Sequence, residues 1–295
     1  MSGRKRRQEV HPALRYVAPS TIQTGVPLAE LVGQESIALL AESMVAVAPA
    51  FNTRRFSRAA LPGLDGLGLM QRAAHVARAL AAELPTDFDS AAEVLIAAFG
   101  PELQATEGNG LAPFFYLPHS QMIALRGGDS LLSGLRACYE LTKRFTAEFC
   151  IRPLLIQHPA KTLKQLRAWV ADPNPHVRRL VSEGTRPRLP WGLRLKAFQD
   201  DPQPTLALLE RLKDDPIPYV YRSVANHLGD ILKDNPEVAY ATCERWLEES
   251  TSLDPDRVAS RLWIVRHALR LPAKRGELQA VRLRQAAKGV RSRGV

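Results

Sequence analysis

The 295-residue sequence is poor in features that would indicate a redox, metal or membrane protein. Its three cysteines, Cys138, Cys150 and Cys243, form no CxxC pair, and its seven histidines show neither HExxH nor zinc-finger spacing. The longest apolar stretch, residues 38–51, contains Glu42 and is shorter than the roughly 20 residues of a membrane-spanning helix. No apolar signal core follows the N-terminus, and strand patterns are almost absent. We therefore expect a cytoplasmic, helical protein with no structural disulfide, metal, other cofactor or membrane contact.

The net charge of +10 is concentrated at the two ends of the chain. Residues 1–15 hold five basic and one acidic side chain, and residues 272–295 hold seven and one, so the other 256 residues balance at 28 of each sign. Such ends are typical either of solubilising tails or of nucleic-acid binding. Within the balanced part, residues 178–196 carry six basic side chains against the single acid Glu183, which is the electrostatic pattern of a polyanion-binding site.

One passage occurs twice at a shift of 43 residues, as DPNPHVRRLVSE at 172–183 and as DPIPYVYRSVAN at 215–226. Each copy has a DP-x-P turn before a helical pattern, and a looser third copy places Arg266 44 residues after Arg222. Periods near 40 to 47 residues with two helices per unit are typical of HEAT-like arrays, whose units stack because none buries its apolar face alone. The alternative, a chance likeness between two amphipathic helices, leaves the shared turn unexplained.

The pattern predicts an all-α, HEAT-like helical repeat superhelix (an α-solenoid) in which the second helix of each pair lines a concave face. We expect this domain over residues 21–271, between a basic, flexible arm at 1–20 and a basic tail at 272–295. Helices are predicted, among others, at 130–148 and 191–198. The repeat register is visible only after about residue 130, and the packing of the earlier helices is left open.

Polar residues follow one stripe of a helix expected over residues 219–232. Arg222, Asn226 and Asp230 are spaced by four residues, which places them on one side of that helix. Asp230 lies near the C-terminal end, where the macrodipole disfavours a negative charge by roughly 0.3–1 kcal/mol. A carboxylate there indicates either a functional role or an ion pair with a nearby base such as Lys233.

The segment after the first copy has an unusual composition. Glu183 precedes Gly184, which we expect to close its helix in the left-handed conformation. In the following TRPRLPW, two prolines stiffen the backbone that carries Arg186, Arg188 and Trp191. A guanidinium held in a stiff frame suits phosphate recognition, and the face of Trp191 suits a cation. The alternative is an inter-repeat turn with solvated arginines and Trp191 as a core anchor.

A further acid, Glu148, stands alone between Phe145 and Phe149 in the word FTAEFCIRP. It is interpreted either as a functional carboxylate or as a helix-surface partner of Arg152, four residues later.

Three segments together resemble the bacterial AlkC/AlkD superfamily of DNA alkylation-repair glycosylases, and the AlkC branch most closely. They are TAEFCIRPLL at 146–155, HVRRLVSEGTRPRLPWG at 176–192 and YVYRSVANHLGDILKDNPE at 219–237, and the likeness covers roughly residues 130–276. The resemblance implies a HEAT-like monomer that holds double-stranded DNA on its concave face and is associated with the nucleoid when bound. It also implies a monofunctional base-excision-repair enzyme that hydrolyses the N-glycosidic bond of cationic purines, such as N3-methyladenine and N7-methylguanine, without base flipping.

The resemblance implies that the catalytic residues are the acids of the EFxIRP, SEG and NHLxD motifs. In this sequence these acids are Glu148, Glu183 and Asp230. Trp191 and Arg179 are implied to contact the lesion. The expected DNA-binding residues are Arg178, Arg186, Arg188, Arg222, Asn226, His227, Arg266 and Arg270. An alkylated purine is already a good leaving group, so carboxylates need only stabilise the cationic sugar and orient a water molecule. Which acid activates the water stays open.

The sequence departs from the family's pattern at Cys150, where a small apolar residue is more usual, and at Tyr221, where an arginine is expected. It also has no strand pattern for the immunoglobulin-like domain that some AlkC-branch proteins carry after the array. Two other functions remain alternatives, namely a non-catalytic HEAT-like DNA-binding protein and a HEAT-like protein-interaction scaffold. An arginine-bearing surface argues against the scaffold, and an assay separates the other two.

Overall fold

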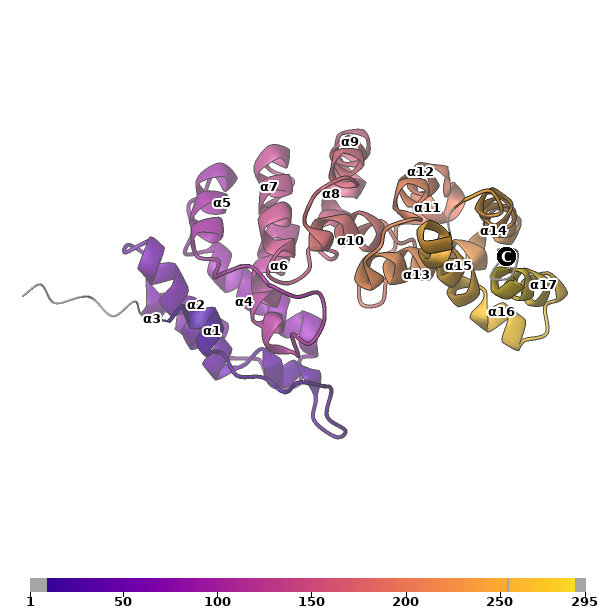
Figure 1. Ribbon diagram of the computed structural model, residues 1–295. Coiled ribbons are helices and arrows are strands. Elements are labelled where there is room, and N and C mark those ends of the chain that lie inside the picture. Colours follow the sequence, from indigo (N-terminus) through magenta and orange to yellow (C-terminus); the bar gives the residue numbers. More distant parts are fainter. Residues whose placement is uncertain (1–9, 254, 290–295) are drawn as a thin grey trace, which may run out of the picture. The chain divides into compact units, whose positions relative to one another are not determined.

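The computed structural model describes residues 10–253 and 255–289, which divide into one unit ending at Thr146 and another beginning at Ala147 (Figure 1). Within these residues the regular elements are all helices and no strand is present, which confirms the all-α prediction. No helix of the described part is long and apolar enough to cross a membrane. The arm expected at 1–20 lies partly outside the described residues, and so does the last part of the expected tail.

The N-terminal unit already contains stacked helix pairs. Its helices are α1 Pro12–Arg15, α2 Gln34–Val47, α3 Thr53–Ala60, α4 Leu69–Ala81, α5 Phe88–Ala97, α6 Leu117–Arg126 and α7 Leu131–Thr142. Helix α4 packs on α6 and α5 packs on α7. Side chains link the two pairs at one repeat length: Arg136 pairs with Glu93, 43 residues earlier, and Arg144 donates to the carbonyl of Gly100, 44 residues earlier. The repeat therefore begins before residue 130, where the sequence shows no register.

The C-terminal unit continues the pattern in two layers. Its helices are α8 Ile151–Gln157, α9 Pro159–Trp169, α10 Pro175–Gly184, α11 Lys196–Asp200, α12 Gln203–Leu212, α13 Pro218–Asp234, α14 Pro236–Ser250, α15 Pro255–Ala268, α16 Arg270–Lys274 and α17 Leu278–Gly289. The second helices α10, α13 and α15 pack in succession, and α9 packs on α12 (Figure 1). Helices α9, α10, α13 and α14 begin at a proline, whose missing N–H costs nothing in the first turn. This is the helix-pair arrangement that the doubled passage predicts.

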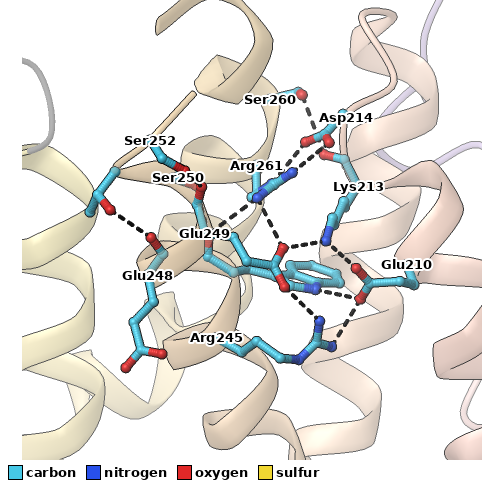
Figure 2. Close-up of polar contacts among 12 residues, drawn as sticks. Glu210, Lys213, Asp214, Arg245, Glu248, Glu249, Ser250, Ser252, Ser260 and Arg261 are labelled. Atoms are coloured by element: carbon cyan, nitrogen blue, oxygen red, sulfur yellow. Dashed lines mark hydrogen bonds and ion pairs between the residues drawn. The ribbon is translucent and has the colours of Figure 1, made fainter. Parts of the chain in front are cut away.

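A polar network joins α12 to α14 and α15 (Figure 2). Glu210 accepts hydrogen bonds from Arg245 at 2.9 Å and from the indole nitrogen of the fully buried Trp246 at 2.8 Å. Arg261, itself buried, binds both carboxylate oxygens of Asp214, 47 residues earlier, at 2.8 and 2.5 Å. Burial opposes ionisation of Glu210, but its hydrogen bonds outweigh this and lower its pKa to about 2. Charged side chains, rather than apolar contact alone, thus connect these two repeats.

The region expected to be a basic tail is largely folded. Helix α17 packs on α14 and α15 and buries Ala280, Leu283 and Ala287. Arg266 donates to the carbonyl of Ala287 at 2.8 Å, and Arg284 donates to the carbonyl of Arg266 at 3.0 Å. The boundary predicted at residue 271 is therefore corrected, because α16 and α17 belong to the C-terminal unit.

Candidate functional site

Three elements of the C-terminal unit carry the three predicted acids. Glu148 lies in the turn before α8, Glu183 lies at the end of α10, and Asp230 lies four residues before the end of α13. Helix α7 ends at Thr142, so the helix predicted over 130–148 is too long and Glu148 is not helical. The packing of α10 on α13 brings acids from distant parts of the sequence to one place.

Two arginines link these acids into one cluster, which we call the acid–arginine cluster (Glu148, Arg179, Glu183, Arg186 and Asp230). Arg179 pairs with Glu148 through Nη1, and its Nη2 lies 3.6 Å from Oε1 of Glu183. Arg186 binds the same Oε1 at 2.6 Å and Oδ2 of Asp230 at 2.8 Å. The five side chains are between 3% and 16% exposed, so the cluster is largely closed to solvent. The structure thus brings together all three predicted acids.

The electrostatics of the cluster keep its central acid ionised. Burial opposes the charge on Glu183, but Arg179 and Arg186 outweigh it and hold the pKa of Glu183 below its usual value. Ser223 on α13 donates to the second oxygen of Glu183 at 2.6 Å, which also favours the carboxylate. Burial acts against the charge on Arg186 as well, but Glu183 and Asp230 raise its pKa. The carboxylate is therefore available as a fixed negative charge at neutral pH.

The surface interpretations of two acids are not supported. Asp230 does pair with Lys233 at 2.9 Å, but its side chain is only 3% exposed and it also pairs with Arg186 in the segment after α10. Glu148 is 12% exposed and pairs with Arg179, 31 residues later, so it is not a helix-surface residue.

A stripe on α13 that the sequence did not indicate faces α10. The ring of Tyr219 lies 5.2 Å below the Arg179 guanidinium, Ser223 binds Glu183, and Nδ1 of His227 lies 2.9 Å from the carbonyl oxygen of Ser182. These residues are spaced by four, and that spacing was the available signal. By contrast, Arg222, Asn226 and Asp230 do not face one common element, although they have the same spacing.

Arg222, Asn226 and Asp230 have different surroundings in the structure. Arg222 is exposed, whereas Asn226 lies 3.2 Å from Nε2 of His267 on α15. Asp230 faces Arg186. The ring of His267 stacks on Trp263 at 4.5 Å, and Arg270 is exposed one helix further on. DNA contacts by Arg222, Asn226, Arg266 and Arg270 stay predictions.

Several predicted DNA-binding groups are engaged within the protein. Arg178 binds Asp215 at 2.6 Å, Arg188 binds Asp234 at 2.7 Å, and Arg186 belongs to the acid–arginine cluster. Their role toward phosphates stays a prediction, and any such contact competes with these ion pairs. His227 is corrected: its side chain is fully buried between α10 and α13, where it has no surface to offer to DNA.

The segment after α10 holds an exposed tryptophan in a strained conformation. Trp191 has φ 61°, the one positive φ of a non-glycine residue in the described part, and is 59% exposed. Helix α11 begins only at Lys196, so neither the helix predicted at 191–198 nor the core-anchor interpretation holds. Gly184 is not left-handed either, because α10 ends through Thr185 at φ −99°. Backbone strain on this scale costs about 1–3 kcal/mol and concentrates at functional sites.

The buried His227 makes stability depend on pH. Burial, the largest influence, lowers the pKa of His227 to about 4, against 6.5 for an ordinary histidine. The unfolded chain therefore binds a proton that the folded protein excludes, and stability should fall as pH falls from about 6.5 toward 4, by at most ~1.4 kcal/mol per pH unit for this group. Urea titrations between pH 7 and 5 measure this slope. A His227→Gln variant should show a shallower slope, and an unchanged slope would contradict the assignment.

Fold and site define an all-α, HEAT-like repeat protein with a buried acid–arginine cluster. No family model matches the chain. It is 33% identical over 257 residues to the uncharacterized protein YhaZ of Bacillus subtilis (strain 168), covering 87% of this chain and 67% of that one. It is 37% identical, with a TM-score of 0.76, to the solved Pseudomonas fluorescens alkylpurine DNA glycosylase AlkC bound to DNA containing an abasic site analog, covering 88% and 68% of the two chains. The chain belongs to the AlkC branch of the AlkC/AlkD superfamily, as the three sequence segments predicted.

Proposed function

We propose that this chain is a monofunctional DNA glycosylase that hydrolyses the N-glycosidic bond of cationic alkylated purines in double-stranded DNA. The observation that carries the proposal is the acid–arginine cluster, which gathers three carboxylates from three elements of a protein of this family. The AlkC relative was solved on DNA with an abasic site analog, and an abasic site is what remains when a base is released.

The chemistry of the cluster suits this reaction. When the bond from C1′ to the purine nitrogen breaks, the alkylated base leaves as a neutral molecule with the bonding electron pair, and positive charge develops on the sugar. Carboxylates near C1′ stabilise that charge, and one of them takes the proton of the attacking water. Arg186 fixes the oxygens of Glu183 and Asp230 in advance, so little reorganisation is required. Attack at the deoxyribose without base flipping is part of the proposal.

Base release from defined DNA tests the proposal. Wild-type protein is incubated with a duplex that contains one N3-methyladenine or N7-methylguanine, and the free base is quantified. We expect release of the methylated base with an intact abasic strand. Binding of the duplex without release would favour a non-catalytic DNA-binding protein, and absence of both binding and release would favour a protein-interaction scaffold.

Exposed arginines of the C-terminal unit should contact the phosphate backbone of DNA. Arg222 and Arg270 are both exposed, and arginine contacts to phosphate make affinity depend steeply on salt. We expect Arg222→Gln and Arg270→Gln each to reduce the slope of log K against log salt by about 1 for undamaged duplex. Arg211→Gln on α12, in the other helix layer, serves as the control and should leave the slope unchanged. Equal slopes in all four proteins would contradict this surface.

A further inference from the structure

A single buried arginine holds the segment that connects the cluster to the exposed tryptophan. Arg152 lies in the first turn of α8, and its side chain is completely buried. Its Nη1 donates to the carbonyl of Gly184 at 3.0 Å, and its Nε donates to the carbonyl of Leu193. The two carbonyls are the first and last of the segment 184–193, so one planar guanidinium joins both ends of that segment.

The segment held in this way carries functional groups of the proposed site. It begins directly after Glu183, and it contains Arg186 of the acid–arginine cluster and Trp191. A displacement of either end would therefore move the Arg186 donors relative to Asp230, or the Trp191 ring relative to the cluster. Proline at 187 and 190 stiffens the interior of the segment.

Close packing of α8 against the end of α10 also indicates that position 152 is specific for arginine. A Cβ on Gly184 would lie 2.6 Å from Cγ2 of Ile151, the residue before Arg152, so α8 approaches the end of α10 as closely as a glycine permits. An arginine fork fits two carbonyl acceptors in this space, whereas a lysine offers one nitrogen.

Burial of the Arg152 side chain is unfavourable for its charge. Burial, the largest influence, lowers the pKa of Arg152 to about 10, although Glu148, Glu183 and Asp230 favour its charge. Its Nη2 is buried without a hydrogen-bond partner among the described residues. A buried, incompletely satisfied charge is unfavourable for stability alone and calls for a functional explanation.

We propose that Arg152 is a positioning residue of the glycosylase site, which fixes Arg186 and Trp191 relative to the carboxylates by holding both ends of the segment 184–193. This inference rests on the proposed function. It predicts that loss of the Arg152 guanidinium slows the chemical step without weakening DNA binding. It also predicts that the segment 184–193 becomes more mobile.

The test compares Arg152→Met and Arg152→Lys with a matched control. Arg72 of the N-terminal unit is also buried and donates to backbone carbonyls, including those of Leu64 at 3.1 Å and Ala29 at 3.2 Å, so Arg72→Met removes a similar buried arginine of the other unit. Three quantities are measured on folded protein: the single-turnover rate of base release, the Kd for lesion-containing duplex, and trypsin cleavage after the exposed Arg194 under native conditions.

For Arg152→Met we expect a rate at least 10-fold lower at unchanged Kd, together with faster cleavage after Arg194. The rate and the cleavage of Arg152→Lys should lie between those of Arg152→Met and those of the wild type. Arg72→Met should keep the wild-type rate and cleavage. A folded Arg152→Met or Arg152→Lys with the wild-type rate and cleavage would overturn the inference, and so would a parallel loss of rate and binding. If the wild type released no base, the proposed function would fail, whereas cleavage after Arg194 would still decide whether Arg152 holds the segment.

Discussion

Replacing Glu183 with glutamine is expected to lower the single-turnover rate of base release by about 100- to 1,000-fold, with little change in DNA affinity. Glu183 is the centre of the acid–arginine cluster, because it accepts from both Arg186 and Ser223 and lies between Arg179 and Arg186. The amide keeps the size of the side chain but removes the negative charge that would stabilise the cationic sugar. Base release from N3-methyladenine duplex under single-turnover conditions measures the effect.

The same measurement on Glu148→Gln and Asp230→Asn shows how the cluster divides its roles. In the wild type, the rate of base release should fall at low pH, because the acid that accepts the proton of water becomes protonated. The variant that lacks this acid should not show that fall. Glu210→Gln is the matched control, since Glu210 also accepts from several donors but belongs to the network of Figure 2. If all three cluster variants kept the wild-type rate, the family would stand and the site would be wrong.

The second large effect concerns stability. Trp246→Ala should lower the free energy of unfolding by about 3–5 kcal/mol, because it removes a fully buried indole and leaves Glu210 without one of its donors. Urea titration followed by circular dichroism measures the change in the transition to which α12–α15 contribute.

Trp191→Ala is the contrasting substitution. This tryptophan is 59% exposed and strained, so its loss should change stability by no more than about 0.5 kcal/mol while slowing base release. The two tryptophans thus separate a structural from a functional role within one residue type. A large loss of stability in Trp191→Ala, with normal activity, would contradict that division.

The three acids of the acid–arginine cluster were selected through short motifs that resemble the AlkC branch. Glu148 precedes the IRP motif, Glu183 is the last residue of the first copy of the repeat, and Asp230 stands in the NHLxD motif. Their meeting follows from the repeat itself, since a helix of one unit packs on its counterpart in the next. Arg186 and Asp230 are 44 residues apart and in contact, which is one repeat length.

The partners of the arginines were not predictable from the sequence. Arg178, Arg186 and Arg188 form a basic run that suggests an outward phosphate surface, yet each binds a carboxylate of α13 or of the loop that precedes it. A local charge count cannot include acids that approach from 37 to 46 residues away. His227 was expected among the DNA-binding residues, although its side chain is buried.

The sequence by itself determined the helical class and the repeat period, because these depend on local periodicity and proline turns, whereas the three acids were selected through the resemblance of short motifs to the AlkC branch. Only the tertiary structure decided which charges neutralise one another, that Trp191 is exposed in a left-handed conformation, and that Arg152 lies buried between two carbonyls. Those outcomes depend on how helices one repeat apart approach each other, and the free energy of a buried charge is set by that approach rather than by its neighbours in the chain.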